Sequence, residues 1–255
     1  MKKISLFIIV IALMIIGKSS FAQDSEKNFH FGLKATPSVS WFTSSDKKLS
    51  NDGVKFGFGY GLITEFAFSK NYAFSTGLEI LNAGGKLAFP KSPDSTYYPV
   101  VNEDVTPNRT DTFLLQSRSY RIRYVNVPLL LKLKTNQIGA MTYFGQFGFD
   151  VSFKWKAMCD DDGYYIGSQP TTRKDVDISE DINFIRLALN VGLGAEYNLS
   201  GSTSLVFSVN YNNGFTNALR TDSKTLCLYK VGKKSNPFEQ KAMLNYVGLT
   251  VGILF

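Results

Sequence analysis

Histidine and cysteine are scarce in this chain, which has one His and two Cys in 255 residues. A zinc module needs several such ligands close together, and a small disulfide-stabilised domain needs several cysteine pairs. Both classes are therefore excluded. Charged residues make up only 19% of the chain and hydrophobic residues 44%, which is too apolar for a disordered protein. The length predicts one domain.

The chain has no long apolar run after its first segment. No later stretch approaches the roughly 20 apolar residues that a membrane-spanning helix needs. The first segment has a different pattern. Lys2 and Lys3 precede an apolar run over Ile4–Ile16, and Ser20-Phe21-Ala22 places small residues at the two positions that signal peptidase reads. We expect residues 1–22 to be a cleaved signal peptide.

Strong charge of either sign is also lacking in the mature domain, residues 23–255. The three lysines of the signal peptide leave with it, so 25 basic residues face 21 acidic ones, a net charge of +4. This value is too small to indicate a nucleic-acid partner.

The mature chain alternates between apolar and small or polar residues with a period of two, which predicts strands with two different faces. From Val54 to Phe68, for example, most even positions are apolar, whereas the odd positions include Lys55, Gly57, Gly59 and Glu65. Eight runs follow this rule: Phe29–Trp41, Val54–Phe68, Tyr72–Leu87, Ser119–Lys134, Met141–Trp155, Asn183–Asn198, Thr203–Phe215 and Ala242–Phe255.

The connections between these runs alternate strictly between short and long. The short ones are 69–71, 135–140 and 199–202, and the long ones are 43–53, 88–118, 156–182 and 216–241. Strict alternation predicts an up-and-down sheet with all short turns at one end and all long loops at the other.

The strand face that carries the small and polar residues distinguishes a soluble ligand-binding barrel from a membrane barrel, because this face combines glycines with charged residues. Its charged members are Lys34, Glu65, Glu79, Lys132, Asp150, Arg186 and Glu196. Small and ionic side chains suit the narrow interior of an eight-stranded barrel. The sequence therefore predicts an all-β fold: a closed, antiparallel, up-and-down barrel of eight transmembrane strands, with short periplasmic turns and long extracellular loops, in the outer membrane of a Gram-negative cell.

Opposite charges confined in this interior favour a closed ionic plug over an open pore, because pairing offsets the cost of desolvation. A small-solute channel is the alternative. The aromatic residues form two groups along the strands, with Trp41, Trp155 and Tyr211 in the outer one, as expected for two membrane interfaces. The strands exceed the roughly 9 to 11 residues that a membrane requires, so the barrel should rise above the outer leaflet.

The chain resembles the PorT-like outer-membrane β-barrel family, which shares its architecture with small OmpA- and OmpX-type barrels. The residues that carry the resemblance are the signal peptide, Phe29–Lys34, the glycine-alternating second strand, Tyr124–Leu133 and the terminal Phe255. The resemblance implies the barrel fold and the outer membrane. Some members are implicated in protein secretion across that membrane, so an accessory role in secretion is a further alternative.

The third and fourth long loops carry opposite charge and one cysteine each. Residues 156–181 have a net charge of −4 and residues 216–241 a net charge of +4. The flanking strands are neighbours, so we expect the two loops to dock. Because disulfides persist outside the cytoplasm, we also predict a disulfide between Cys159 and Cys227, with two unpaired thiols as the alternative.

Three other features have two readings. Arg121 and Arg123 share the outward phase near the outer headgroups, where they can bind lipopolysaccharide phosphates or end a solvated strand. The run Asp160–Asp162 has oxygen ligands suited to calcium but lacks the spacing of a dedicated loop, which favours a solvated loop. His30, the single imidazole, falls at the periplasmic start of the first strand, where a lumen-lining role is favoured over catalysis.

We therefore predict a monomeric, non-enzymatic outer-membrane barrel without catalytic, metal or cofactor sites. Its external loops are expected to serve binding, adhesion or assembly with an extracellular or outer-membrane partner. Lipid and lipopolysaccharide surround it.

Overall fold

The computed structural model describes residues 28–44, 49–89, 97–101, 113–165, 168–230 and 233–255. The predicted signal peptide, residues 1–22, lies outside the described residues, as do the side chains of residues 97–101 and 227–237. Within the described chain, no helix is long and apolar enough to cross a membrane.

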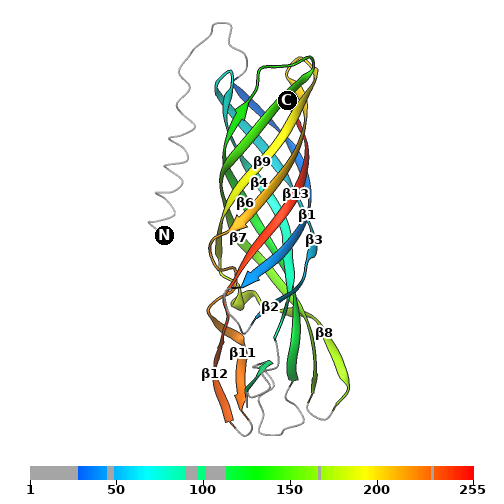
Figure 1. Cartoon of the computed structure of the whole chain (residues 1–255), viewed down its shortest axis with the longest axis vertical. Helices are drawn as coiled ribbons and strands as arrows, with labels where there is room; N and C mark the ends of the chain where they lie inside the picture. Colours follow the sequence, from blue (N-terminus) through cyan, green and yellow to red (C-terminus); the bar gives the residue numbers. More distant parts are fainter. Residues whose placement is uncertain (1–27, 45–48, 90–96, 102–112, 166–167, 231–232) are drawn as a thin grey trace, which may run out of the picture.

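Eight antiparallel strands pair into a closed ring. Figure 1 shows the resulting barrel from the side. The strands are β1 (Phe29–Ser44), β3 (Lys55–Ser69), β4 (Tyr72–Ala88), β6 (Phe113–Lys134), β7 (Met141–Tyr165), β9 (Ile185–Ser200), β10 (Thr203–Gly214) and β13 (Ala242–Leu254). Each pairs with the next in this order. Pairing of β13 with β1, from Gly32 opposite Leu254 to Ser44 opposite Ala242, closes the ring. The predicted fold class is confirmed.

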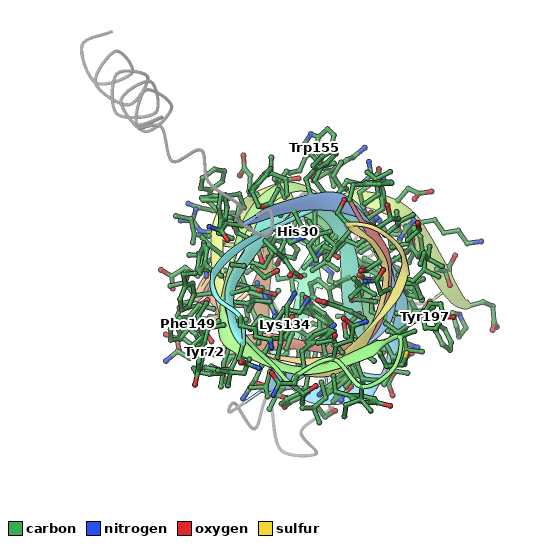
Figure 2. The ribbon with its side chains drawn as sticks, turned by 90° about the horizontal axis from the view of Figure 1, so that it is seen from above. His30, Tyr72, Lys134, Phe149, Trp155 and Tyr197 are labelled. Carbon is green, nitrogen blue, oxygen red and sulfur yellow. The ribbon has the colours of Figure 1, made fainter. Side chains whose placement is uncertain are left out.

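The two faces of the strands are assigned as predicted, with apolar side chains outside and charges inside. Phe56 is 85% exposed and Leu62 50%, whereas Glu65 on the same strand is fully buried. Figure 2 shows the same division: Lys134 projects within the ring, while Phe149 and Tyr197 project from its outer surface. An outer surface of this kind is stable only against lipid.

The glycines of the inner face make space for polar side chains. A Cβ atom built on Gly59 would lie 2.1 Å from the carboxylate of Glu79, and one on Gly192 would lie 2.0 Å from the amide oxygen of Asn210. Because either contact is far inside van der Waals distance, a larger residue would displace the polar group that fills the barrel.

The barrel continues beyond the membrane into an external extension, which lies at the lower end of Figure 1. Here β6 and β7 run on beyond the other strands, and shorter elements join them. These are β2 (Ser50–Gly53), β5 (Tyr97–Val101), β8 (Pro170–Asp177), the 3₁₀ turn η3 (Ser179–Asp181), β11 (Asp222–Lys230) and β12 (Lys233–Glu239). The strands are longer than a membrane requires, as predicted, and much of the chain expected to be loop is sheet.

An apolar core fills the outer half of the barrel and the base of the extension. It joins inward residues of the barrel strands, such as Phe42, Tyr120 and Leu244, to Ile178 and Leu219 from the long connections. A smaller cluster near the periplasmic end contains Ile63, Phe144, Val206 and Leu254. The inner face is thus mainly polar in the periplasmic half and mainly apolar in the outer half.

A β-bulge in β7 separates these halves. Arg123 pairs with Lys156, and the next residue of β6, Tyr124, pairs with Lys154, so Trp155 is the extra residue. A bulge reverses the side-chain phase of all later residues. Above it the odd-numbered Ala157, Cys159 and Asp161 are buried, whereas below it the even-numbered residues Asp150 and Ser152 are.

Pro128 has no N–H to donate to the ladder, which predicts a bulge at this position, but the prediction is wrong. Pro128 pairs in register with Asp150 on β7. On its other side the β4–β6 register is the same before and after it, with Thr76 opposite Leu129 and Glu79 opposite Asn126, and the pairs between them are missing. The ladder is interrupted without a shift.

Candidate functional site: the filled lumen and the external extension

Four charged side chains form one cluster in the periplasmic half of the lumen. The ammonium of Lys132 contacts both Glu65 and Glu196, and Lys134 reaches the same carboxylates at 2.8 and 2.9 Å. Glu65 is fully buried and Lys132 is 1% exposed. Two cations between two carboxylates leave no net charge, which lowers the cost of burying the cluster.

Lys134 is absent from the predicted network, although its sequence position could have placed it there. It follows Lys132 by two residues on β6 and therefore has the same inward phase. The ammonium of Lys132 also lies 3.9 Å from the ring centroid of Phe144, a cation–π contact within the lumen.

Above this cluster Lys34 donates to Glu79 at 2.9 Å, an ion pair between two members of the predicted set. Asp150 and Arg186 are also buried in the lumen, but among the described residues they form hydrogen bonds rather than an ion pair. Asn212 joins them: its NH₂ donates to Asp150 at 2.6 Å, and its amide oxygen accepts from Arg186.

Neutral groups also satisfy both ions on their other sides. Asp150 accepts from Asn190 at 3.1 Å and from the hydroxyl of Tyr246 at 3.2 Å, and Arg186 donates to the carbonyl of Leu244 at 2.7 Å. An amide can donate and accept at once, so it links two charges that are too far apart to touch. Charge patterning in the sequence does not reveal such links.

Little space is left in the lumen. The cavity between Lys34, Glu79, Asp150 and Tyr246 has a volume of about 30 Å³, enough for one or two waters. A vestibule of about 680 Å³ opens at the periplasmic end, lined in part by His30, Lys70 and Lys134. The vestibule ends at the ionic cluster.

The external end of the lumen is closed by a second buried cluster. Arg118 donates to both carboxylate oxygens of Asp161, at 2.6 and 2.8 Å, and to the hydroxyl of Thr225 at 3.1 Å. It also lies 3.7 Å from Asp181. All three charged side chains are fully buried. Sequence analysis missed this cluster because it placed Arg118 in a loop rather than on the inner face of a strand.

The predicted docking of the third and fourth long loops is confirmed, and Asp181 forms the joint. Its carboxylate accepts from the backbone N–H of Lys224 and Thr225 and from the hydroxyl of Ser223. The N–H of Arg220 donates to the carbonyl of Asp181 at 2.8 Å. The joint therefore consists mainly of hydrogen bonds to one carboxylate rather than of many ion pairs between the two loops.

The predicted disulfide is not formed, because Cys159 is a free, buried thiol. Its Sγ lies 3.3 Å from a carboxylate oxygen of Asp161, and burial raises the pKa of the thiol well above its usual range. The backbone of Cys227 pairs with Val100 and Pro237 rather than with β7, and its side chain lies outside the described residues. Neighbouring strands thus do not place the two loops' cysteines together.

The three aspartates at 160–162 lie on a strand and diverge. Asp161 points inward to Arg118, whereas Asp160 pairs with Arg121 at 2.6 Å and Asp162 with Lys86 at 3.4 Å. Alternation along β7 sends their carboxylates to opposite faces, so they do not converge on one ion. The expectation of a solvated loop is corrected to a strand with ion pairs.

Both predicted lipopolysaccharide contacts lie on the outer face of β6. Arg121 pairs with Asp160 and, at 2.8 Å, with Asp175. Arg123 donates to Asn82 at 3.0 Å and packs over Trp155 at 5.8 Å from the ring. Trp155 projects from the outer surface of the ring in Figure 2.

The closed ring, the lipid-facing apolar surface and the filled polar lumen define an integral outer-membrane β-barrel. The chain belongs to the outer membrane protein beta-barrel domain family, whose model matches residues 21–220.

Solved structures with a similar arrangement include OprG from Pseudomonas aeruginosa, with 12% identity, a TM-score of 0.46, and 89% of this chain and 95% of that one covered. The protease OmpT from Escherichia coli shares 9% identity at a TM-score of 0.41, covering 94% and 99%. Ail from Yersinia pestis, solved with a heparin analogue, shares 13% identity at a TM-score of 0.36, and the match covers 89% of this chain and 98% of Ail. No curated protein matches.

Proposed function

We propose that this protein is a non-conducting, non-enzymatic barrel whose external extension binds a partner, in adhesion, recognition or assembly. The double closure of the lumen carries this proposal. An ionic cluster around Lys132 closes the periplasmic half, and the apolar core with Arg118 and Asp161 closes the external half. The barrel also acts as a monomer, because a ring closed by β13 on β1 leaves no barrel edge to pair with another copy.

The extension offers two edges at which a protein partner can bind. The sheet order ends at β8 on one side and at β12 on the other. Edge strands present unpaired backbone donors and acceptors to an incoming strand. Most side chains of β8 are exposed, including Lys174.

Site-specific photo-crosslinking in intact cells tests the binding role. A photoreactive residue at Lys174 on β8 should form a discrete protein adduct. The matched control is the same residue at Leu193, which is 71% exposed on the lipid-facing surface of β9 and should give no protein adduct. The same protein adducts at both positions, or no adduct at either position, would refute the external binding role.

Planar-bilayer recording tests the closed lumen against the channel alternative. Purified protein should insert without steady unitary conductance, because about 30 Å³ of free volume does not form a continuous water path. Reproducible single-molecule steps from the unaltered protein would favour a small-solute channel.

The non-enzymatic role is supported by the position of His30. It lines the periplasmic vestibule and not the external rim, where an outer-membrane hydrolase would need its base. His30→Ala should therefore leave every surface phenotype of the protein unchanged, and a loss of phenotype in this folded variant would argue for catalysis.

The PorT-like resemblance supports a more specific form of the proposal, in which the extension assists protein secretion across the outer membrane. Deletion of the gene should then deplete a set of proteins from the culture medium and retain them in the periplasm. An unchanged set of secreted proteins would restrict the role to adhesion or recognition.

A further inference from the structure

A basic groove lies on the outer side of the barrel, lined by residues of β3, β4, β6 and β7. Its volume is about 260 Å³, and four cationic residues line it: Lys55, Arg121, Arg123 and Lys156. Arg123 and Lys156 are paired across β6 and β7. Like charges directly opposite each other on one face of a sheet are destabilising, so this arrangement calls for a neutralising anion.

The protein itself neutralises the groove only in part. Arg121 has carboxylate partners, Asp160 and Asp175. Of the described residues, none forms an ion pair with Lys55, Arg123 or Lys156.

Neutral or distant groups are the remaining partners of these cations. Lys55 donates to the hydroxyl of Ser119 at 2.9 Å, and Arg123 donates to an amide oxygen. Asp177 acts on Lys156 only at longer range, and its carboxylate accepts the N–H of Ser179 at 2.8 Å. Cations therefore outnumber the carboxylates that reach the groove.

The groove borders the lipid phase on its apolar side. Phe56 lines it and is 85% exposed, and Trp155, which packs beneath Arg123, is 60% exposed. Exposed Trp on a membrane barrel marks the level of the headgroups. A site with cations on one side and an exposed aromatic residue on the other matches a lipid with an anionic headgroup better than it matches a free anion.

We propose that this groove binds a phosphate group on the headgroup of an outer-leaflet glycolipid. Arg123 and Lys156 donate to the phosphate oxygens as charge-assisted hydrogen bonds, Lys55 and Arg121 lie beside them, and Phe56 packs along the adjoining acyl chain. The proposal depends on the outer-membrane location alone, so it stands or falls independently of the external partner.

Binding of lipid A to the purified mature protein in zwitterionic micelles tests this proposal by calorimetric titration. Bisphosphorylated lipid A should bind saturably, whereas lipid A stripped of both phosphates should bind at least about tenfold more weakly, since each charge-assisted hydrogen bond contributes roughly a factor of ten. The double variant Arg123→Gln/Lys156→Gln should lose affinity for bisphosphorylated lipid A to a similar degree.

Lys241→Gln is the matched control. It removes an exposed cation from the connection between β12 and β13, away from the groove, and should leave affinity unchanged. Both altered sites are near the surface, and far-ultraviolet circular dichroism checks that each variant folds. Equal affinity for the two lipids, or an equal loss in the Lys241 variant, would overturn the site. Displacement of lipid A by millimolar inorganic phosphate would show that the ligand is a free anion and would overturn the assignment to a lipid.

Discussion

Lys132 is the residue on which the periplasmic half of the lumen most depends. Its ammonium is the shared partner of Glu65 and Glu196, and it is 1% exposed. Lys134 contacts the same carboxylates from a position nearer the vestibule, with its side chain 15% exposed. The two lysines therefore have similar partners but different access to water.

Substitution of Lys132 by Met should destabilise the barrel by about 3–5 kcal/mol, because it leaves two buried carboxylates with one cation between them. Lys134→Met, the matched variant, should cost less, since water reaches that side of the cluster. Urea unfolding in lipid vesicles measures both free energies of unfolding. Equal losses of unfolding free energy would show that the depth of the lysine in the lumen does not affect its contribution to stability.

Cys159 should be chemically inert in the folded protein. Burial raises the pKa of its thiol, so the reactive thiolate is rare at neutral pH. Maleimide should label this cysteine only after denaturation. Peptide mapping without reducing agent should find no Cys159–Cys227 peptide, and finding that peptide would contradict the buried thiol.

At the scale of elements, the connection η3 acts as a clamp between the third and fourth long loops. Asp181 is fully buried and accepts hydrogen bonds from the start of β11, whereas the adjacent Glu180 is exposed. Two neighbouring acidic residues in one short turn thus differ completely in their surroundings.

Asp181→Ala should loosen β11 and leave the membrane strands intact, because it removes the acceptor for two backbone N–H groups at the start of β11 while Arg118 keeps its ion pair with Asp161. Hydrogen–deuterium exchange should increase by at least tenfold at residues 222–226 and stay unchanged in β9. Glu180→Ala is the control and should exchange like the unaltered protein. Uniform exchange across all three proteins would show that Asp181 is not a clamp.

The lumen of the whole molecule is filled at two levels in series, and we expect each to block passage independently. The ionic cluster lies at the periplasmic half, and the apolar core, which includes Tyr124 and Tyr246, lies beyond the 30 Å³ cavity. A path through the barrel opens only when both are removed.

Planar-bilayer conductance should therefore be non-additive across a set of variants. Lys132→Ser with Glu65→Ser should stay silent, as should Tyr124→Ala with Tyr246→Ala, and only the fourfold variant should conduct. Steady conductance from either double variant alone would show that the closure left intact does not seal the barrel.

The sequence alone determined the membrane barrel, its strand number and the direction of each face, because period-two alternation is a local property of every strand. Phe56, Leu62 and Glu65 lie as their phase predicts. The alternating loop lengths likewise determined that the short turns lie at one end of the barrel and the long loops at the other. Lys134, which shares the phase of Lys132, could have been added to the lumen set by the same rule.

The tertiary structure decided which polar groups meet and how the external half is built. Asp150 and Arg186 both face inward as predicted, yet Asn212 links them, because their heights in the barrel depend on the register of three strands, β7, β9 and β10. The bulge at Trp155 reverses the phase of β7 and sends Cys159 into a core instead of toward Cys227. Such contacts join residues far apart in the chain, and their geometry arises only when the ring closes.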